Sequence, residues 1–128
     1  MKKPTVVVMC AVVVLLSLSP LKARAFDALQ IVQLISTNKC LGCDLTRANL
    51  SNRNLSGAAL SGSNLGGSNL SYANLTGAAL DGTNLGGANL TQANLAGANL
   101  TGAQLSGATW TNGTTVCAPG SIGVCKPK

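Results

Sequence analysis

Leucine recurs at every fifth position over more than half of the chain, and this period constrains the fold more than any other feature. The series runs through fourteen consecutive pentads, from residue 43 to residue 112. A small residue, most often Ala, stands two positions before most of the central residues. We expect the central residues to form the core: Leu45, Leu50, Leu55, Leu60, Leu65, Leu70, Leu75, Leu80, Leu85, Leu90, Leu95, Leu100, Leu105 and Trp110.

A period of five fits neither a straight helix nor a straight strand. Five positions turn an α-helix by about 140°, and an odd step along a strand alternates between its two faces. Both arrangements would leave many leucines in water. A backbone that turns by about a right angle at every pentad directs all of them at one axis, and four pentads then close a square coil. The abundant Gly and Asn suit such turning, because both tolerate positive φ.

A four-sided coil predicts a second period of twenty residues, and the sequence contains it. Residues 55–70 recur with few changes as residues 75–90. The residue two positions after each central residue is usually Gly, but at one set of these positions, spaced by twenty along the chain, other residues replace it. One side of the coil is therefore chemically distinct. We take its corner residues and its hydroxyl ladder as the candidate face: Asn52, Tyr72, Gln92, Asn112, Ser51, Ser71, Thr91 and Thr111.

The tandem Ala-Asn-Leu-x-x pattern resembles the pentapeptide-repeat family over residues 43–112. The resemblance implies an all-β fold, a right-handed quadrilateral β-helix with the leucines and the preceding small residues inside. Fourteen pentads at four per coil correspond to about 3.5 coils and a column roughly 17 Å tall at the usual strand spacing. A leading helix, a Cys-x-x-Cys segment and a trailing Cys pair resemble exported members of this family that are common in cyanobacteria.

The ends of the chain predict a leader and two caps. Residues 1–25 have a Lys pair, an apolar block of about 13 residues and Ala23-Arg24-Ala25, which is typical of a signal peptide cleaved before Phe26. The block is short for a membrane span, although a retained anchor is the alternative. Residues 26–42 carry a dense apolar helical pattern, expected to cap the first coil. Residues 43–112 form the repeat, and residues 113–128 a closing loop.

The distribution of charge argues against a nucleic-acid partner. The whole chain carries +6, but four of its nine basic residues lie in the leader, which leaves five bases against three acids, or +2. Mimicry of DNA would need a negative field, and the repeat has only Asp44 and Asp81 against Arg47 and Arg53. Arg53 occupies an inward position, so we expect it to extend toward the N-terminal end and pair with Asp44 or Asp27.

Composition also removes most enzyme chemistry. The chain has no His and only three acidic residues, so it lacks a Ser-His-Asp or Cys-His nucleophile and an imidazole metal ligand. We expect no enzymatic activity, no cofactor and no metal site. The remaining catalytic hypothesis is a redox pair formed by Cys40 and Cys43.

Four cysteines follow the leader, and an even number in an exported chain favours disulfides. Three pairings are conceivable. Cys40 and Cys43 flank the first coil while Cys117 and Cys125 follow the last, and the height of the column disfavours bonds between its ends. We predict Cys40–Cys43 and Cys117–Cys125. A remnant metal site that uses all four is an alternative.

Together these observations predict an exported monomer that acts as a non-enzymatic scaffold or interaction module with an unknown protein partner. Its expected location is the periplasm, the thylakoid lumen or the medium, without stable membrane insertion after cleavage of the leader. A thiol-disulfide protein using Cys40 and Cys43 is the main alternative. An ice or glycan binder using the hydroxyl ladder is a further one.

Overall fold

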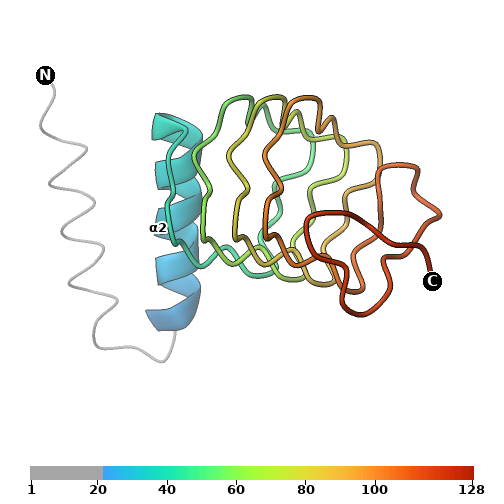
Figure 1. The fold of residues 1–128 in the computed structure, drawn as a ribbon. Coiled ribbons are helices and arrows are strands. Elements are labelled where there is room, and N and C mark those ends of the chain that lie inside the picture. Colours follow the sequence, from blue (N-terminus) through green and yellow to red (C-terminus); the bar gives the residue numbers. More distant parts are fainter. Residues whose placement is uncertain (1–21) are drawn as a thin grey trace, which may run out of the picture.

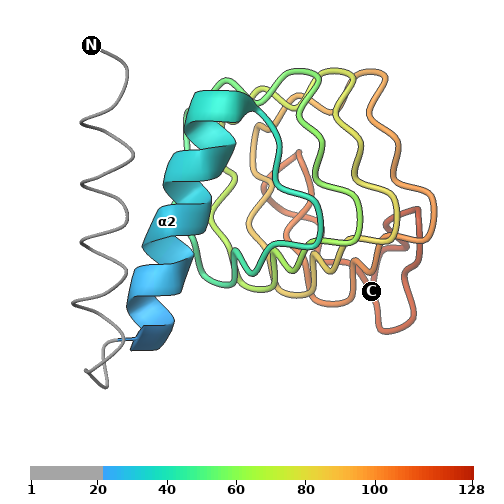
Figure 2. The same ribbon diagram turned by 90° about the vertical axis from the view of Figure 1, so that its left-hand side faces the viewer.

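A computed structural model describes residues 22–128, which form one helix followed by a square column of backbone. The helix, α2 (Lys22–Thr37), lies across one end of the column, and the C-terminal segment lies at the other end (Figure 1). Figure 2 shows the coils of the column stacked one behind another, away from α2. The expected leader lies outside the described residues up to residue 21, and its expected cleavage position after Ala25 falls within α2.

Among residues 28–37 of α2, one face packs against the column. Leu34 is fully buried and Ile31 packs against the core, whereas Val32 and Ile35 are exposed. Only some of the apolar side chains of the helix therefore contribute to the core. The helix ends at Thr37, and the next residue, Asn38, has a φ of 57° and donates its N–H to the Leu34 carbonyl at 2.8 Å. Asn tolerates this left-handed terminal position. No helix among residues 22–128 combines the length and apolar character needed to cross a membrane.

Residues twenty positions apart pair in parallel along the column. At one junction the Leu70 N–H donates to Asn89 O at 2.8 Å, the Tyr72 N–H to Thr91 O at 2.8 Å, and the Asn89 N–H to Ser68 O at 2.9 Å. This set of three bonds recurs between successive coils, so four pentads complete one coil. We number the sides by their bridging residues: side 1, Lys39, Ala59, Ala79 and Asn99; side 2, Asp44, Asn64, Asn84 and Gln104; side 3, Asn49, Asn69, Asn89 and Thr109; side 4, Asn54, Asn74 and Asn94.

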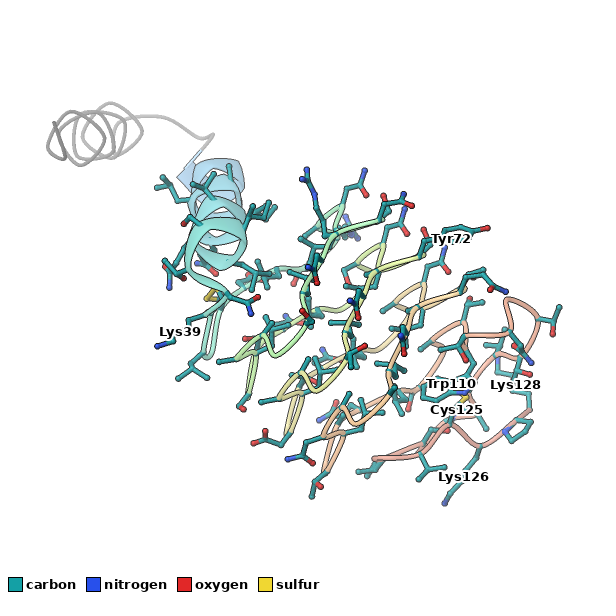
Figure 3. All side chains as sticks on the ribbon, turned by 90° about the horizontal axis from the view of Figure 1, so that it is seen from above. Lys39, Tyr72, Trp110, Cys125, Lys126 and Lys128 are labelled. Atoms are coloured by element: carbon teal, nitrogen blue, oxygen red, sulfur yellow. A yellow bond between two sulfur atoms is a disulfide. The ribbon has the colours of Figure 1, made fainter. Side chains whose placement is uncertain are left out.

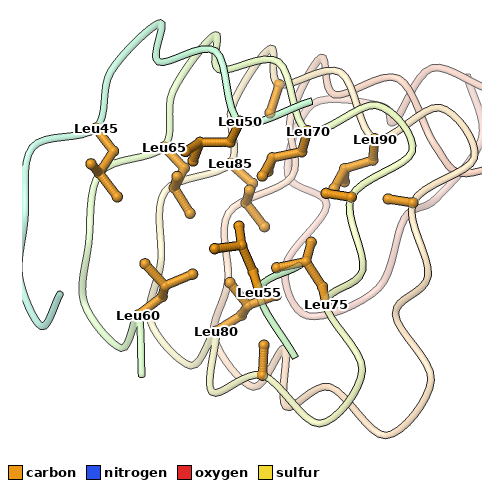
Figure 4. Close-up of a cluster of buried hydrophobic side chains, with 14 of the residues drawn as sticks. Leu45, Leu50, Leu55, Leu60, Leu65, Leu70, Leu75, Leu80, Leu85 and Leu90 are labelled. Atoms are coloured by element: carbon orange, nitrogen blue, oxygen red, sulfur yellow. The ribbon is translucent and has the colours of Figure 1, made fainter. Parts of the chain in front are cut away.

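The central leucines point into the column and form its core (Figure 4). Those from Leu45 to Leu90, and Leu105, are at most 1% exposed. Leu95, Leu100 and Trp110 are only partly buried. These three lie at the C-terminal end of the column, where fewer side chains stack above them. Full burial therefore depends on a coil on each side and not on the pentad pattern alone.

The corners of the column lie two residues after each leucine, and the backbone there is left-handed. Gly occupies most of these positions, with Gly62 at a φ of 69° as an example. The same conformation is adopted by four residues that are not glycine: Arg47, Asn52, Tyr72 and Gln92, with φ between 57° and 59°.

After Trp110 the chain reverses and covers part of the last coil. Gly113 makes this reversal possible, because its φ is 75° and a Cβ there would lie 2.9 Å from Thr91 Cγ2. The returning segment pairs antiparallel with sides 3 and 2, through the bridges Thr109–Val116 and Gln104–Ile122. Sides 4 and 1 receive no such bridge from the described residues, although Gly123 lies close to Leu100 O and Gly102 N at the end of side 1.

Candidate functional site

The candidate face follows side 3 and its corner. Asn49, Asn69 and Asn89 pair in register, so the corner residues that follow them also repeat along the column axis. Tyr72 is 61% exposed and projects outward from the column (Figure 3). The structure therefore stacks Asn52, Tyr72 and Gln92 in one backbone conformation along one corner.

Asn112, the fourth expected corner residue, has a different environment. It lies in the chain reversal, where its Nδ2 donates to Thr115 Oγ1 at 2.7 Å and its Oδ1 accepts from the Thr114 and Thr115 N–H groups. Its φ does not fall in the left-handed region that the other three share. Asn112 therefore stabilises the reversal, and the stacked corner has three members.

The backbone conformation of this corner is costly for residues with a side chain. A residue other than Gly in the left-handed region loses roughly 1–2 kcal/mol relative to its preferred conformations, with a smaller loss for Asn. The corresponding corners on side 4 use Gly, at Gly57, Gly77 and Gly97, and those on side 2 do so except at Arg47. The fold would accept Gly at Tyr72 and Gln92 as well, so folding does not explain the side chains at these positions. Residues whose strained backbone does not stabilise the fold occur often at functional positions.

The hydroxyl ladder of the candidate face is bonded within each turn. Ser51, Ser71 and Thr91 donate to the Oδ1 atoms of the Asn two residues earlier, at 2.7, 2.7 and 2.6 Å. Thr111 has no such partner two residues earlier, because Thr109 stands at the Asn position. The first three hydroxyls therefore present oxygen lone pairs to solvent but have already used their hydrogen atoms.

The cysteines join in the pairs that the sequence favours. Cys40–Cys43 and Cys117–Cys125 are disulfides with Cα–Cα distances of 5.4 and 5.0 Å. Cys40 is fully buried, so an external thiolate has no access to its sulfur, whereas Cys43 is partly exposed. The Cys43 N–H donates to Ser63 Oγ at 3.2 Å, which ties the disulfide loop to the next coil.

Within residues 28–128, charged side chains are few, and all but the partly exposed Asp81 are exposed. The pKa of the Asp44 carboxyl is lowered because the Thr46 hydroxyl, and then the Thr46 N–H, donate hydrogen bonds to it. Arg53 is exposed at its inward sequence position, and Asp44 bonds Thr46 rather than Arg53. The side chain of Asp27, the other expected partner, lies outside the described residues. In residues 22–128 no three acidic, Cys or His side chains gather as a possible metal site.

Several polar side chains that cover the N-terminal edge of the column were missed at the sequence level. Gln33 Nε2 donates to Lys39 O at 3.2 Å, Gln30 Oε1 accepts from the Asp44 N–H, and Asn38 Nδ2 donates to Ser56 O at 2.8 Å. These contacts satisfy backbone groups that have no preceding coil. Two Gln residues spaced by three in the otherwise apolar stretch of residues 28–35 are the signal that could have identified them.

Comparison with known proteins places the chain in a family. The model of pentapeptide repeats matches eight copies, over residues 43–87 and 73–109. The chain belongs to the pentapeptide-repeat family, which confirms the resemblance drawn from the repeated Ala-Asn-Leu pattern. Among curated proteins, none matches the chain significantly.

Solved structures of family members from cyanobacteria are similar to this chain. The pentapeptide repeat protein Rfr23 from Cyanothece 51142 is 31% identical, with a TM-score of 0.54, over 63% of this chain and 82% of that one. HetL from Nostoc sp. strain PCC 7120, involved in heterocyst differentiation regulation, is 35% identical over 59% of this chain and 40% of its own length, with a TM-score of 0.25. Another pentapeptide repeat protein from Nostoc Pcc 7120 is 35% identical over 59% and 76% of the two chains, with a TM-score of 0.27. The fold that family membership implies is the right-handed quadrilateral β-helix.

Proposed function

We propose that this protein is a non-enzymatic interaction module that binds a protein partner through the corner formed by Asn52, Tyr72 and Gln92. The observation that carries the proposal is the left-handed backbone of these three residues, because Gly would serve the fold there at lower cost. Tyr72 supplies an exposed aromatic ring, and aromatic residues contribute disproportionately to the energy of protein interfaces. The Ser and Thr oxygens beside it provide hydrogen-bond acceptors.

The proposal includes an architecture of about three and a half coils with two caps. Residues 43–112 form the coils, residues 26–42 with α2 form the N-terminal cap, and residues 113–128 form the C-terminal one. The bonds from Gln33 and Asn38 to backbone carbonyls support the first cap, and the antiparallel bridges to sides 2 and 3 support the second. Caps over the N-terminal end and over sides 2 and 3 leave fewer free edges for self-association, which favours a monomer.

Export to an oxidising compartment is part of the same proposal. Two disulfides and the leader pattern of residues 1–25 support it, because disulfides persist in the periplasm and comparable compartments. The thylakoid lumen and the medium satisfy the same requirement. Pulse labelling followed by N-terminal sequencing of the exported chain tests the cleavage before Phe26.

Affinity capture with variants of the corner tests the interaction. Tyr72→Gly and Gln92→Gly together remove both side chains and keep the left-handed backbone, so the fold is retained. We expect the double variant to lose the partner that the parent chain captures. Thr76→Ala with Gln104→Ala changes two exposed residues on sides 4 and 2 and is the matched control, expected to retain the partner. Retention of every captured partner by the glycine variant would contradict the proposal.

The thiol-disulfide alternative depends on the partial exposure of Cys43 and has its own test. A structural disulfide has a reduction potential below about −300 mV, whereas an exchange protein is markedly more oxidising. Equilibration of the chain with glutathione and thioredoxin buffers measures this potential. We expect the structural value. For the ice or glycan alternative, thermal hysteresis and glycan capture are the corresponding measurements.

A further inference from the structure

Backbone pairing at the C-terminal end of the column is complete on side 2. The Leu105 N–H donates to Ser121 O at 2.9 Å and the Gly107 N–H to Cys117 O at 2.9 Å. The Gly123 N–H donates to Ala103 O at 2.8 Å. These are the same three groups of a pentad that pair between coils within the column. The returning segment therefore substitutes for a further coil on this side.

Sides 4 and 1 lack this pairing, although Gly123 lies beside the end of side 1, where a Cβ on it would be 3.4 Å from Leu100 O and 3.8 Å from Gly102 N. We call the terminal residues of these two sides, 93–102, the open step. Within the part of the chain that the structure describes, no backbone partner meets six groups of this step: the N–H groups of Leu95, Gly97, Leu100 and Gly102 and the carbonyls of Ala93 and Ala98. They are the groups that pair at every internal junction. Leu95 and Leu100 are also only partly buried, whereas Leu75 and Leu80, one coil earlier, are fully buried.

The chain itself is directed away from the open step. Continued coiling would carry residues 113–122 across sides 4 and 1, but the reversal at Gly113 sends them back over sides 3 and 2. Residues 93–104 contain no charged residue and no Pro, the usual devices that prevent strand pairing at an exposed edge. The step is thus an unprotected strand edge with two aliphatic side chains beneath it.

The charge at this end indicates the chemistry of an occupant. Lys126 and Lys128 lie at the same end of the molecule as Trp110 (Figure 3), and no Asp or Glu follows Asp81 in the sequence. Two copies that met through these ends would bring like charges together. The opposite end of a second copy is a poor match as well, because the Ser56 carbonyl that would accept a bond on side 4 is already bonded to Asn38 Nδ2.

We infer that the open step binds an extended, acidic segment of a partner protein by strand addition. The segment forms the backbone bonds that a further half coil would form, and it places aliphatic side chains over Leu95 and Leu100. Main-chain bonds provide affinity in this mode, and the alternate side chains provide specificity. The inference rests on the proposed function as an interaction module but concerns a surface separate from the Tyr72 corner.

A ten-residue peptide with the sequence of residues 73–82 is a suitable probe. These residues occupy sides 4 and 1 one coil earlier, so the peptide copies the strand that would stack on the step, and it contains Asp81. Amide hydrogen exchange of the full chain, followed by NMR, is the measurement. In the free protein we expect the four open N–H groups to exchange at least ~100-fold faster than those of Leu75, Gly77, Leu80 and Gly82. Saturating peptide should slow them at least ~10-fold.

Two control peptides and one control variant accompany the hydrogen-exchange measurement. A peptide N-methylated at the residues that correspond to Asn74 and Ala79 lacks the two donors to the step and should give no protection. A peptide with Lys in place of the Asp should bind more weakly than the parent peptide, because it brings a positive charge to the end of the molecule that already carries Lys126 and Lys128. Tyr72→Gly should leave peptide protection unchanged, which separates this test from that of the corner. Absence of protection by the parent peptide, or protection that appears on raising the protein concentration alone, would overturn the inference, the latter in favour of self-association.

Discussion

Ser68 is a buried hydroxyl that its surroundings do not satisfy. It occupies the inward small-residue position of side 3, where the other three members of the series are Ala48, Ala88 and Ala108. Among the described residues its Oγ has no hydrogen-bond partner. Thr83, in the same position of the neighbouring side, donates to the Leu80 carbonyl at 2.7 Å. A buried polar group without a partner costs about 1–3 kcal/mol, so Ser68 lowers the stability of the column.

We therefore predict that Ser68→Ala raises the free energy of unfolding by about 1 kcal/mol, because Ala fills the position without a polar atom. Ser63→Ala is the matched control, since the Ser63 hydroxyl bonds both the Cys43 N–H and the Cys40 carbonyl. It should lower the same free energy by about 1 kcal/mol. Urea titrations monitored by circular dichroism measure both. A loss of stability in Ser68→Ala as large as that in Ser63→Ala would contradict the explanation.

Asp44 makes the stability depend on pH in a definite direction. Its pKa is lowered in the folded chain by the Thr46 hydroxyl and N–H, so it lies below the pKa in the unfolded chain. These bonds stabilise the fold above the ordinary carboxyl pKa of about 4, and the contribution is lost as the pH falls through the folded value. We expect a titration of the Asp44 carboxyl by NMR to have its midpoint below 3.8.

Two variants separate the causes of this shift. Thr46→Ala removes the larger of them and should raise the Asp44 midpoint. Asp44→Asn keeps an oxygen acceptor for Thr46, as in the Asn74–Thr76 pair, and removes the titration. The contribution of this position to acid sensitivity of the melting temperature should then disappear. An unchanged acid sensitivity in Asp44→Asn would assign it to another group.

Among the elements, the C-terminal segment depends on its disulfide. Cys117 pairs with side 3 through its N–H, which donates to Ala108 O at 2.9 Å, and bonds Cys125 eight positions later. The segment has few other buried side chains, since Val116, Ile122 and Val124 are exposed. Closure of a loop by the disulfide therefore provides much of the order that this element has.

We predict that Cys117→Ser with Cys125→Ser lowers the free energy of unfolding by about 2–3 kcal/mol, the loop-closure value for this length. Hydrogen exchange locates the effect. The amide of Gly107, which donates to Cys117 O, should lose protection, whereas that of Leu55, which donates to Asn74 O in an internal junction, should not. An equal loss at both amides would indicate that the disulfide stabilises the entire column rather than its end.

For the whole molecule, the pairing of residues twenty apart makes one coil the unit of insertion and deletion. Removal of residues 61–80 leaves every remaining residue on its side and keeps Asn52 in register with Gln92. Removal of residues 61–65 instead rotates everything that follows by a quarter turn relative to α2. Both chains preserve the five-residue pattern, so both should fold.

Spin labels at Ser36 and Thr114 report this difference. We expect the twenty-residue deletion to shorten the distance between the labels by about one strand spacing, ~4.8 Å, without a change of side. The five-residue deletion should instead move the C-terminal label around the column. The same distance change in both variants would contradict a four-sided register.

Much of the architecture follows from short-range regularity that is visible in the sequence. The period of five requires a turn at each pentad, and the period of twenty requires four turns per coil, because only then does every leucine from Leu45 to Leu90 reach one interior. The odd register of Asn52, Tyr72 and Gln92 was equally visible, since it interrupts a series of glycines. The burial of Arg53 was harder to predict from the pattern. Its position in the pentad indicates the interior, but its long side chain is exposed at the edge of the first coils.

The remaining features depend on contacts that no local pattern encodes. The sequence by itself determined the repeat, its period and the chemically distinct side, because each pentad meets the same neighbours as the next. Only the tertiary structure decided how the column ends: that Asn38 bonds Ser56 O, that the chain reverses at Gly113, and that Leu95 and Leu100 remain partly exposed. At an end the repeating neighbour is missing, so burial and hydrogen bonding depend on where segments outside the repeat come to lie in three dimensions.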